Sequence, residues 1–342
     1  MKYLRKFDSV SDMDTEIASS EINIMGLAYN NGVPVMRIKS GDSPVPPMPT
    51  LSTPFYVENI TNDVEELRIY IGYIEMNIEY STDNVHWNTL PTLPDEEYRV
   101  GMSINPGDKI YLRTRANYWC DDYGSGEGTP GNSFEGSQFS KVGGNIMSLF
   151  YGENFTGEET EFPTQGEWTS ALGGIFRENS NLIDASELII PATANGCCYE
   201  MFYNCSSLTI APTLPAETLA KDCYHRMFYG CSSLVTAPAL PAMTLARHCY
   251  DSMFIYCSSL TTVPELPATT LVDYCYEYMF KDCTNLNYIK CLATNISASQ
   301  CTNNWVKNVA STGTFVKNSS MSNWTTGQNG IPSGWTVQDA TE

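Results

Sequence analysis

Apolar residues recur every 26 positions through the second half of the chain. On this period lie the pairs Met201-Phe202, Met227-Phe228, Met253-Phe254 and Met279-Phe280, and the cysteines Cys197, Cys205, Cys223, Cys231, Cys249, Cys257, Cys275, Cys283 and Cys301. A unit of this length cannot bury its own apolar face and must stack on its neighbours. The period therefore predicts a solenoid over residues 144–303. A degenerate copy of the repeat, at Ile175-Phe176, precedes the clear copies.

Within one repeat, the retained positions indicate a helix. In the copy that begins at Leu219, the residues kept between copies lie four, five, eight, nine and twelve positions further on, which is one face of an α-helix. The short apolar run Leu234–Ala237 follows and ends at Pro238, as a strand would. We therefore expect each unit to be a helix plus a strand, with the strands stacked in parallel as in a leucine-rich repeat.

In the first half of the chain, apolar and polar residues alternate instead. Glu66–Ile71 and Met76–Tyr80 alternate strictly, as half-buried strands do, and Lys109–Arg113 is another short extended run. Several short strands at such spacing predict an immunoglobulin-like β-sandwich over residues 50–143.

The two ends of the chain differ from both patterns. Residues 1–40 predict a small anchor element, in which Ser9 or Ser11 begins a short helix through about Ile17. Ile22–Ala28 and Val33–Ile38 then predict a hairpin around an Asn-Gly turn.

Proline makes residues 41–49 a stiff linker. After Cys301 the register decays, and residues 304–342 are expected to cap the repeats. The predicted fold class is thus multidomain α+β: a small N-terminal anchor, a β-sandwich, and a leucine-rich-repeat solenoid with a C-terminal cap.

Charge and hydropathy narrow the possible partners. The formal net charge is −20, and most of the excess falls before residue 197. An acidic chain without a basic stripe repels phosphate, so neither nucleic acid nor an anionic membrane is an expected partner. Charges interrupt the opening Met1–Asp8 before an apolar signal region can form, and no run approaches the length of a membrane span. We therefore expect synthesis in a cytoplasm and no membrane insertion.

The cysteine spacing favours buried thiols. Within a unit the spacing is C-x7-C, which is not the pairing of a zinc site, and cysteine is a small, readily buried hydrophobe. If helices stack about 10 Å apart, neighbouring cysteines are too distant for the roughly 4.4–6.8 Å between Cα atoms that a disulfide needs. The thiols are expected to be free and inert.

No cofactor or metal is expected elsewhere either. The loop Cys120–Gly128 clusters acidic oxygens that could hold calcium, but the EF-hand order of ligands is absent, which favours a solvated loop. The sequence contains no P-loop, no Gly-x-Ser-x-Gly elbow and no His-Glu-x-x-His motif. His225 and His248 stand in different slots of successive repeats and are expected to be solvated. An enzyme is therefore not predicted.

The candidate binding residues are those that change between copies. They occupy the face of the predicted helix opposite the retained residues: Lys221, Asp222, His225, Arg226, Tyr229, Arg247, His248, Asp251, Tyr256, Asp273, Tyr274, Glu277, Tyr278 and Lys281. Mixed charge with tyrosine suits a binding surface. Two alternatives stay open: an ordinary solvated face, and binding on the predicted strand face. The strand face carries Thr209, Ile210, Val235, Thr236, Thr261 and Thr262.

The run Cys223–Ala242, with its order Cys-Tyr-x-x-Met-Phe-x-x-Cys-Ser-Ser-Leu, resembles the BspA-like leucine-rich repeats of gut Bacteroidales and their phages. Gly144–Leu149 and Gly330–Val337 are similar to the segments that bracket such repeats, so the resemblance covers about 144–338. The opening Lys2–Phe7 resembles the start of phage structural proteins from the same hosts.

The resemblance implies surface recognition and adhesion. Because no export signal is seen, we expect a virion surface attachment protein, either a head or tail fibre or a capsid decoration protein, made in the host cytoplasm. Its N-terminal region would bind a virion structural protein, its solenoid a host surface protein or glycan, and a homo-oligomer is expected. The alternative is an exported bacterial surface adhesin of the same repeat family.

Overall fold

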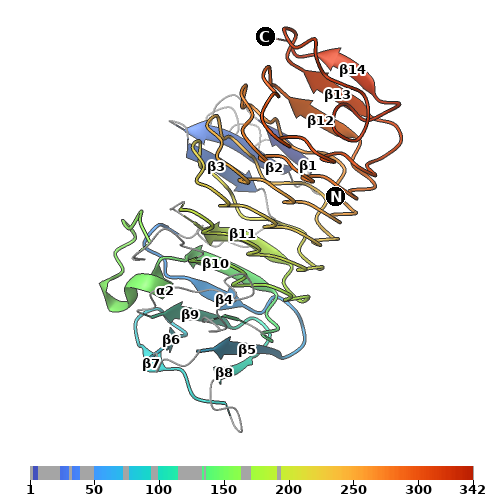
Figure 1. Ribbon diagram of the computed structural model, residues 1–342. Coiled ribbons are helices and arrows are strands. Elements are labelled where there is room, and N and C mark those ends of the chain that lie inside the picture. The colour runs from blue at the N-terminus through green and yellow to red at the C-terminus, as the bar shows by residue number, and fades with distance from the viewer. Residues whose placement is uncertain are drawn as a thin grey trace. The chain divides into compact units, whose positions relative to one another are not determined.

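The chain divides into two compact units, Met1–Met48 and Pro49–Glu342. The computed structural model describes residues 3–6, 24–30, 33–38, 50–71, 77–93, 99–114, 133–134, 136–162, 171–190 and 194–341. In the first unit, β1 (Tyr3–Lys6) pairs in parallel with β2 (Ile24–Asn30), and β2 pairs antiparallel with β3 (Val33–Ile38) (Figure 1). The predicted hairpin is confirmed by the pairing of Asn30 with Val33. The helix expected up to Ile17 lies outside the described residues.

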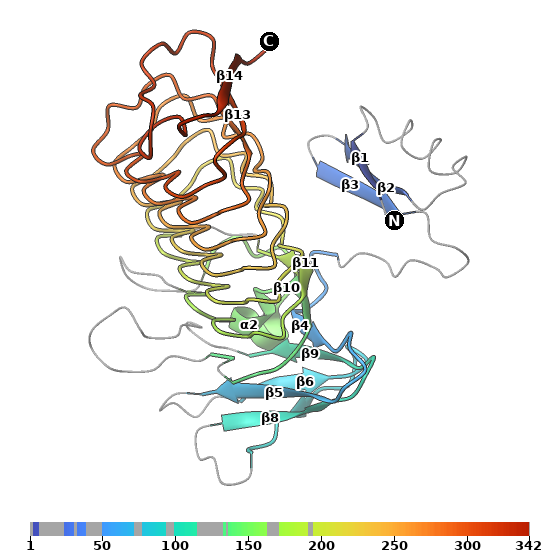
Figure 2. The ribbon, with the colours of Figure 1, turned by 90° about the vertical axis from the view of Figure 1, so that its right-hand side faces the viewer.

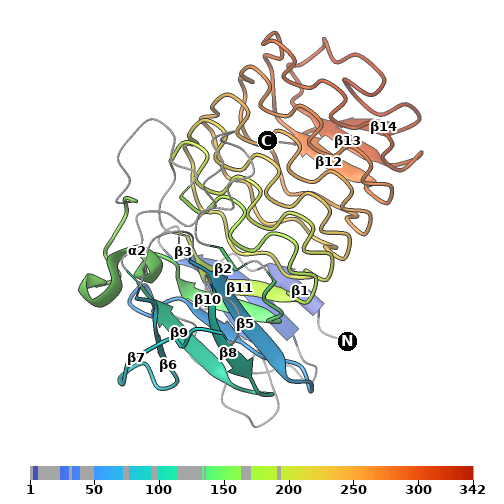
Figure 3. The ribbon, with the colours of Figure 1, turned by 60° about the horizontal axis from the view of Figure 1, so that its bottom comes forward.

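The second unit begins with two sheets. Its elements are β4 (Tyr56–Glu58), β5 (Glu65–Tyr70), β6 (Glu79–Ser81), β7 (Asn88–Thr89), β8 (Arg99–Ile104), β9 (Lys109–Arg113), β10 (Lys141–Asn145), α2 (Ser148–Tyr151), the 3-10 helix η1 (Gly152–Asn154), β11 (Asp184–Ile189), β12 (Tyr288–Cys291), β13 (Thr314–Lys317) and β14 (Thr336–Asp339). The larger sheet has the order β11-β10-β4-β9-β6-β7, and β5 pairs with β8 in a separate ladder (Figure 3).

The alternating sequence pattern of Glu66–Ile71 is confirmed in β5, and β9 alternates as well. In β5 the side chains of Leu67 and Ile69 are buried while those between them are not. The larger sheet is mixed, since β10 pairs antiparallel with β4 and in parallel with β11. β11 lies within the degenerate repeat copy, and a parallel bridge joins its Asp184 to Ile210, so the sheet continues directly into the repeats.

The predicted fold class, an α+β protein with helix-and-strand leucine-rich repeats in a solenoid, is wrong. Within the described ranges, the only α-helix is the four-residue α2, and the segment predicted as a helix in each repeat is a series of turns. The predicted strand Leu234–Ala237 is also missing, and a single parallel bridge joins Thr236 to Thr262 there. The repeats are therefore built from turns and isolated bridges.

Left-handed backbone explains why no helix forms. In one repeat Asp222, Arg226 and Gly230 have φ of 56°, 53° and 74°, and the equivalent residues of the next repeats are also left-handed. A left-handed residue at every fourth position cannot belong to a right-handed α-helix. The amphipathic spacing is real, but it arises from successive four-residue turns.

Backbone hydrogen bonds alternate along each rung, by which we mean one 26-residue repeat. Met227 N–H donates to the Tyr224 carbonyl of the same rung at 3.2 Å, whereas Phe228 N–H donates to the Met253 carbonyl of the next rung at 3.0 Å. An α-helix would direct both groups to carbonyls four residues back. The alternation satisfies the turns and binds each rung to its neighbour. Figure 2 shows the rungs stacked one on the next.

The retained residues form the core, as predicted. Cys223, Met227 and Phe228 are fully buried. The phenylalanines stack in a ladder along Phe176, Phe202, Phe228, Phe254 and Phe280, with ring centroids 5.4–5.8 Å apart. Phe176 also packs on Phe55 at 5.9 Å, which joins the sheets and the rungs in one hydrophobic core.

The last rung is closed by the tail of the chain. Trp305 is fully buried in the slot of the Met-Phe pair, and its Nε1 donates to the Gly330 carbonyl at 2.8 Å. Asn304 N–H donates to Asn329 Oδ1 at 2.7 Å, and Val306 N–H donates to the Gln328 carbonyl at 3.3 Å. These bonds replace those that a further rung would supply. Beside them, β12, β13 and β14 form a parallel sheet (Figure 1).

The described cysteines are free and buried, whereas Cys120 lies outside the described residues. The sequence predicts that a wide helix spacing keeps the cysteines apart. That reason is wrong, because backbone hydrogen bonds join neighbouring rungs directly. Instead, Cys231 Sγ donates to the Phe202 carbonyl of the preceding rung, and Cys257 Sγ donates to that of Phe228, each at 3.1 Å. The thiols of the column Cys205, Cys231, Cys257 and Cys283 are thus donors in the packing of one rung on the next.

Candidate functional site

The residues that vary between repeats lie together on one side of the rungs. We define the outer band as positions 221, 222, 225, 226, 229 and 230 and the equivalent positions of the other rungs. Exposure varies along it: among the predicted residues Arg247, Tyr256 and Asp273 are exposed, whereas the others apart from Asp251 are half-buried. Asp251 is an exception to the predicted surface, since only 6% of it is exposed.

Tyrosines stack across three rungs of the outer band. The rings of Tyr203 and Tyr229 lie 4.6 Å apart and nearly parallel, and Tyr256 meets Tyr229 edge-on at 5.5 Å. Tyr256 is 48% exposed, so one end of this row is open to a partner. Stacked aromatic rings offer contact area that needs little ordering on binding.

An acidic residue that was not predicted holds two arginines beside these rings. Glu200 is 5% exposed and pairs with Arg177 and with Arg226, whose Nη1 lies 3.1 Å from Glu200 Oε1. Arg177 also lies over the Tyr203 ring at 4.4 Å. The signal was available, because Glu200 stands 26 residues before the predicted Arg226.

A second row of rings contains both repeat histidines. Tyr199, His225, His248 and Tyr274 follow one another with centroids 5.1, 6.0 and 4.5 Å apart. The expectation of solvated histidines is wrong, since the side chains of His225 and His248 are only 17% and 21% exposed. The turn geometry places position 225 of one rung beside position 248 of the next, which a helical interpretation does not do.

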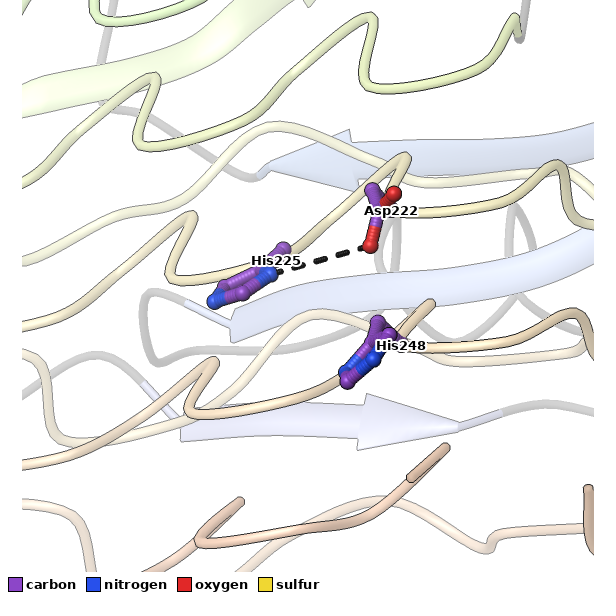
Figure 4. Close-up of side chains that lie close together, drawn as sticks. All are labelled: Asp222, His225 and His248. Atoms are coloured by element: carbon purple, nitrogen blue, oxygen red, sulfur yellow. Dashed lines mark ion pairs between the residues drawn. The ribbon is translucent and has the colours of Figure 1, made fainter. Parts of the chain in front are cut away.

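Carboxylates flank the histidine rings. Asp222 Oδ1 lies 3.9 Å from His225 Nδ1 (Figure 4). Asp251 Oδ2 lies 2.8 Å from His248 Nδ1. Burial alone would raise the pKa of the Asp222 carboxyl, but contact with His225 and the positive charge of Lys221 outweigh it and hold this pKa below its usual value. Asp222 therefore stays anionic at neutral pH.

Two groups of side chains in this row have the composition of a metal site. Asp222, His225 and His248 form one group, and His248, Asp251 and Glu277 form the other. The ligand atoms of each group lie within 4.8 Å of one another. Sequence spacing did not indicate either group.

Towards the C-terminal rungs the outer band becomes more polar. Glu277 Oε1 accepts from Asn303 Nδ2 at 2.7 Å, and Asp273 Oδ1 accepts from Ser299 N–H at 2.9 Å. Lys281 lies over the Tyr278 ring at 5.6 Å. The two hydrogen bonds join adjacent rungs, whereas the contact of Lys281 with Tyr278 lies within one rung.

The predicted strand face, which competes with the outer band as the binding surface and is called the competing face below, also lies at the surface. Ile210 and Val235 are 49% and 50% exposed, and the threonines beside them are exposed or half-buried. This face carries no charged side chain among its predicted members, so it offers less chemical variety than the outer band. The acidic loop Cys120–Gly128 lies outside the described residues.

The chain matches no protein-family description, no curated protein and no solved structure. Within the described part of the chain, no helix has the length and apolar character needed to cross a membrane.

Proposed function

We propose that the chain is a virion surface attachment protein, a head or tail fibre or a capsid decoration protein, whose outer band binds a host surface protein or glycan. One observation carries this proposal: the residue type is retained at the inner positions of the rungs and changes at the outer positions of the same rungs. Inner positions such as 227 and 228 repeat Met and Phe and fill the core. Outer positions exchange tyrosine, arginine, histidine and acids on the same backbone, which suits recognition better than catalysis.

A cell-binding experiment tests the outer band. Fluorescently labelled protein is incubated with a panel of Bacteroidales strains, and the bound fraction is compared with that of a Tyr229→Ala/Tyr256→Ser variant. We expect binding to fall at least tenfold, because both aromatic contacts are removed. The matched control is Val235→Ser/Thr236→Ala on the competing face. Loss of binding in the control alone would transfer the site to that face, and no binding to any strain would contradict adhesion.

The location of the protein is tested separately. Mass spectrometry of purified phage particles should detect the chain, and deletion of residues 1–40 should prevent its incorporation while the second unit stays folded. Residues 1–40 fall within the separate compact unit Met1–Met48, which supports a distinct role for them. Detection only in a bacterial cell-surface fraction would contradict the virion location and favour the exported adhesin.

A further inference from the structure

Three side chains from two adjacent rungs converge on the outer band. Asp222 and His225 belong to one rung and His248 to the next, and Figure 4 shows the three lying close together. One ligand atom of each lies within 4.8 Å of the other two. The two imidazole rings are nearly parallel, with an interplanar angle of 19°.

We propose that Asp222, His225 and His248 bind a divalent transition-metal ion of the zinc class. Two imidazole nitrogens and one carboxylate oxygen are ligands that zinc accepts. Bonds of about 2.0–2.1 Å to a tetrahedral ion place the ligand atoms about 3.3 Å apart. Asp222 Oδ1 and His225 Nδ1, now 3.9 Å apart, reach that separation by a small side-chain rotation.

The carboxylate of Asp251 orients His248, one of the proposed ligands. Asp251 Oδ2 lies 2.8 Å from His248 Nδ1, and its other oxygen accepts from Ser252 Oγ at 2.6 Å. Histidines that bind metals generally engage their second nitrogen with a carboxylate or carbonyl, which fixes the ring and raises its basicity. Asp251 supplies this contact and leaves the other nitrogen of His248 for the ion.

The alternative group, His248 with Asp251 and Glu277, is the weaker site. It contains one imidazole and two carboxylates, and both carboxylates already accept hydrogen bonds, from Ser252 and from Asn303 Nδ2. The two groups share His248. An ion that binds one nitrogen of this ring therefore belongs to only one of the two groups. The group with two imidazoles suits a zinc-class ion better.

The backbone holds the proposed ligands in place before any ion binds. Asp222 and His248 occupy equivalent left-handed positions, both with φ of 56°. Asp222 N–H donates to the Arg247 carbonyl at 3.1 Å, which ties the two rungs together directly beside the site. One opposing cost is Lys221, whose Nζ lies 3.5 Å from Asp222 Oδ2 and must move away from an incoming cation.

With three protein ligands, the ion keeps a coordination position for water or for a group on a partner. The side chains are partly exposed, so that this position opens on the outer band. The inference is independent of the proposed attachment function, because metal binding is measurable on the isolated chain without cells or phage.

Calorimetric titration with zinc chloride tests the site on full-length protein stripped with EDTA. We expect one ion per chain with an affinity on the order of micromolar. His225→Gln and His248→Asn should weaken binding at least 100-fold, and Asp251→Asn by about 10–100-fold. Asparagine is chosen at 248 because it tolerates left-handed backbone. The matched control is His86→Gln in the turn after β6, which should bind as the unmodified chain does.

Cobalt substitution identifies the ligands without any variant. Visible absorption bands of nitrogen and oxygen coordination would support the site, whereas an intense thiolate-to-cobalt band would overturn it, since the ion would then occupy cysteines. Absence of saturable zinc binding by the unmodified chain would also overturn it. So would equal affinities in the His225→Gln and His86→Gln variants. If a histidine variant fails to fold, Asp222→Asn, which keeps the left-handed position, replaces it.

Discussion

Neighbouring residues of one rung face opposite surroundings. Phe228 lies in the phenylalanine ladder, with rings 5.4 Å away on one side and 5.5 Å on the other. Tyr229, the next residue, lies on the outer band and contacts Tyr203 and Tyr256. Along the rung, two residues whose side chains point into the core alternate with two whose side chains point outward. This order follows from the four-residue turns.

Phe228→Ala should therefore destabilise the protein far more than Tyr229→Ala. Loss of a fully buried aromatic costs about 3–5 kcal/mol, which lowers Tm by roughly 10 °C in a unit of this size. Loss of Tyr229 removes a partly exposed stacking contact of about 1 kcal/mol. Differential scanning calorimetry of both variants measures the difference, and equal Tm values would contradict the inward placement of Phe228.

The buried thiols predict a loss of stability in alkali. Burial raises the pKa of Cys249 and of Cys291 to about 12, whereas an unfolded cysteine titrates near 8.5. Their contribution is fully present below pH 8.5 and decreases as the pH rises from there towards 12, because only the unfolded chain releases the protons. Each thiol lowers the free energy of unfolding by about 1.4 kcal/mol per pH unit in this window.

Denaturant unfolding between pH 8 and pH 11 measures this slope. A Cys249→Ala/Cys291→Ala variant is the control, and its slope should be shallower by about 2.7 kcal/mol per pH unit. Identical slopes would mean that these thiols ionise in the folded protein.

At the scale of the element, left-handed residues define the turn. From Asn204 onwards, one outer column is made of Asn204, Gly230, Tyr256, Asp282 and Asn308, all with positive φ. Four of the five are Asn, Asp or Gly, the residue types that adopt this conformation most readily. Tyr256 is the exception, and its exposed side chain makes it a suitable position to measure backbone strain.

Tyr256→Asn should raise the stability and Tyr256→Val should lower it. A β-branched residue in the left-handed region is strained, with a cost of about 1–2 kcal/mol, whereas asparagine is tolerated there. Chemical denaturation of the two variants gives the difference. If valine were as stable as asparagine, the four-residue turn would not depend on left-handed backbone at this column.

The same column shows what the sequence could and could not reveal. The inner positions were predictable, because burial selects the same apolar residues in every rung, as at Met227 and Phe228. The turn itself was hidden, because two-in, two-out turns and an amphipathic helix place apolar residues at the same offsets. Asn204, Asp282 and Asn308 were the available signal against a helix. The meeting of His225 with His248 could not be predicted, since it depends on how one rung is placed on the next.

At the scale of the whole second unit, one core runs through the sheets and the rungs to Trp335. Each rung satisfies the N–H groups of the rung before it, so the array needs a different structure where it ends. The tail supplies this through Asn329 and Gln328, which accept from the backbone of Asn304 and Val306. Trp324 stacks on Trp305 at 5.6 Å and covers the last aromatic layer.

Removal of residues 319–342 should therefore cause self-association. The truncation leaves the N–H groups of Asn304 and Val306 without their acceptors and exposes the Trp305 ring, which together resemble an open sheet edge. Light scattering after size exclusion should show larger species than the intact chain forms at equal concentration. A control that lacks only Thr341 and Glu342 should behave as the intact chain, because the closing contacts lie upstream. If the particles formed by the truncated chain contained no more copies than those formed by the intact chain, the tail would not be what prevents the rungs from pairing end to end.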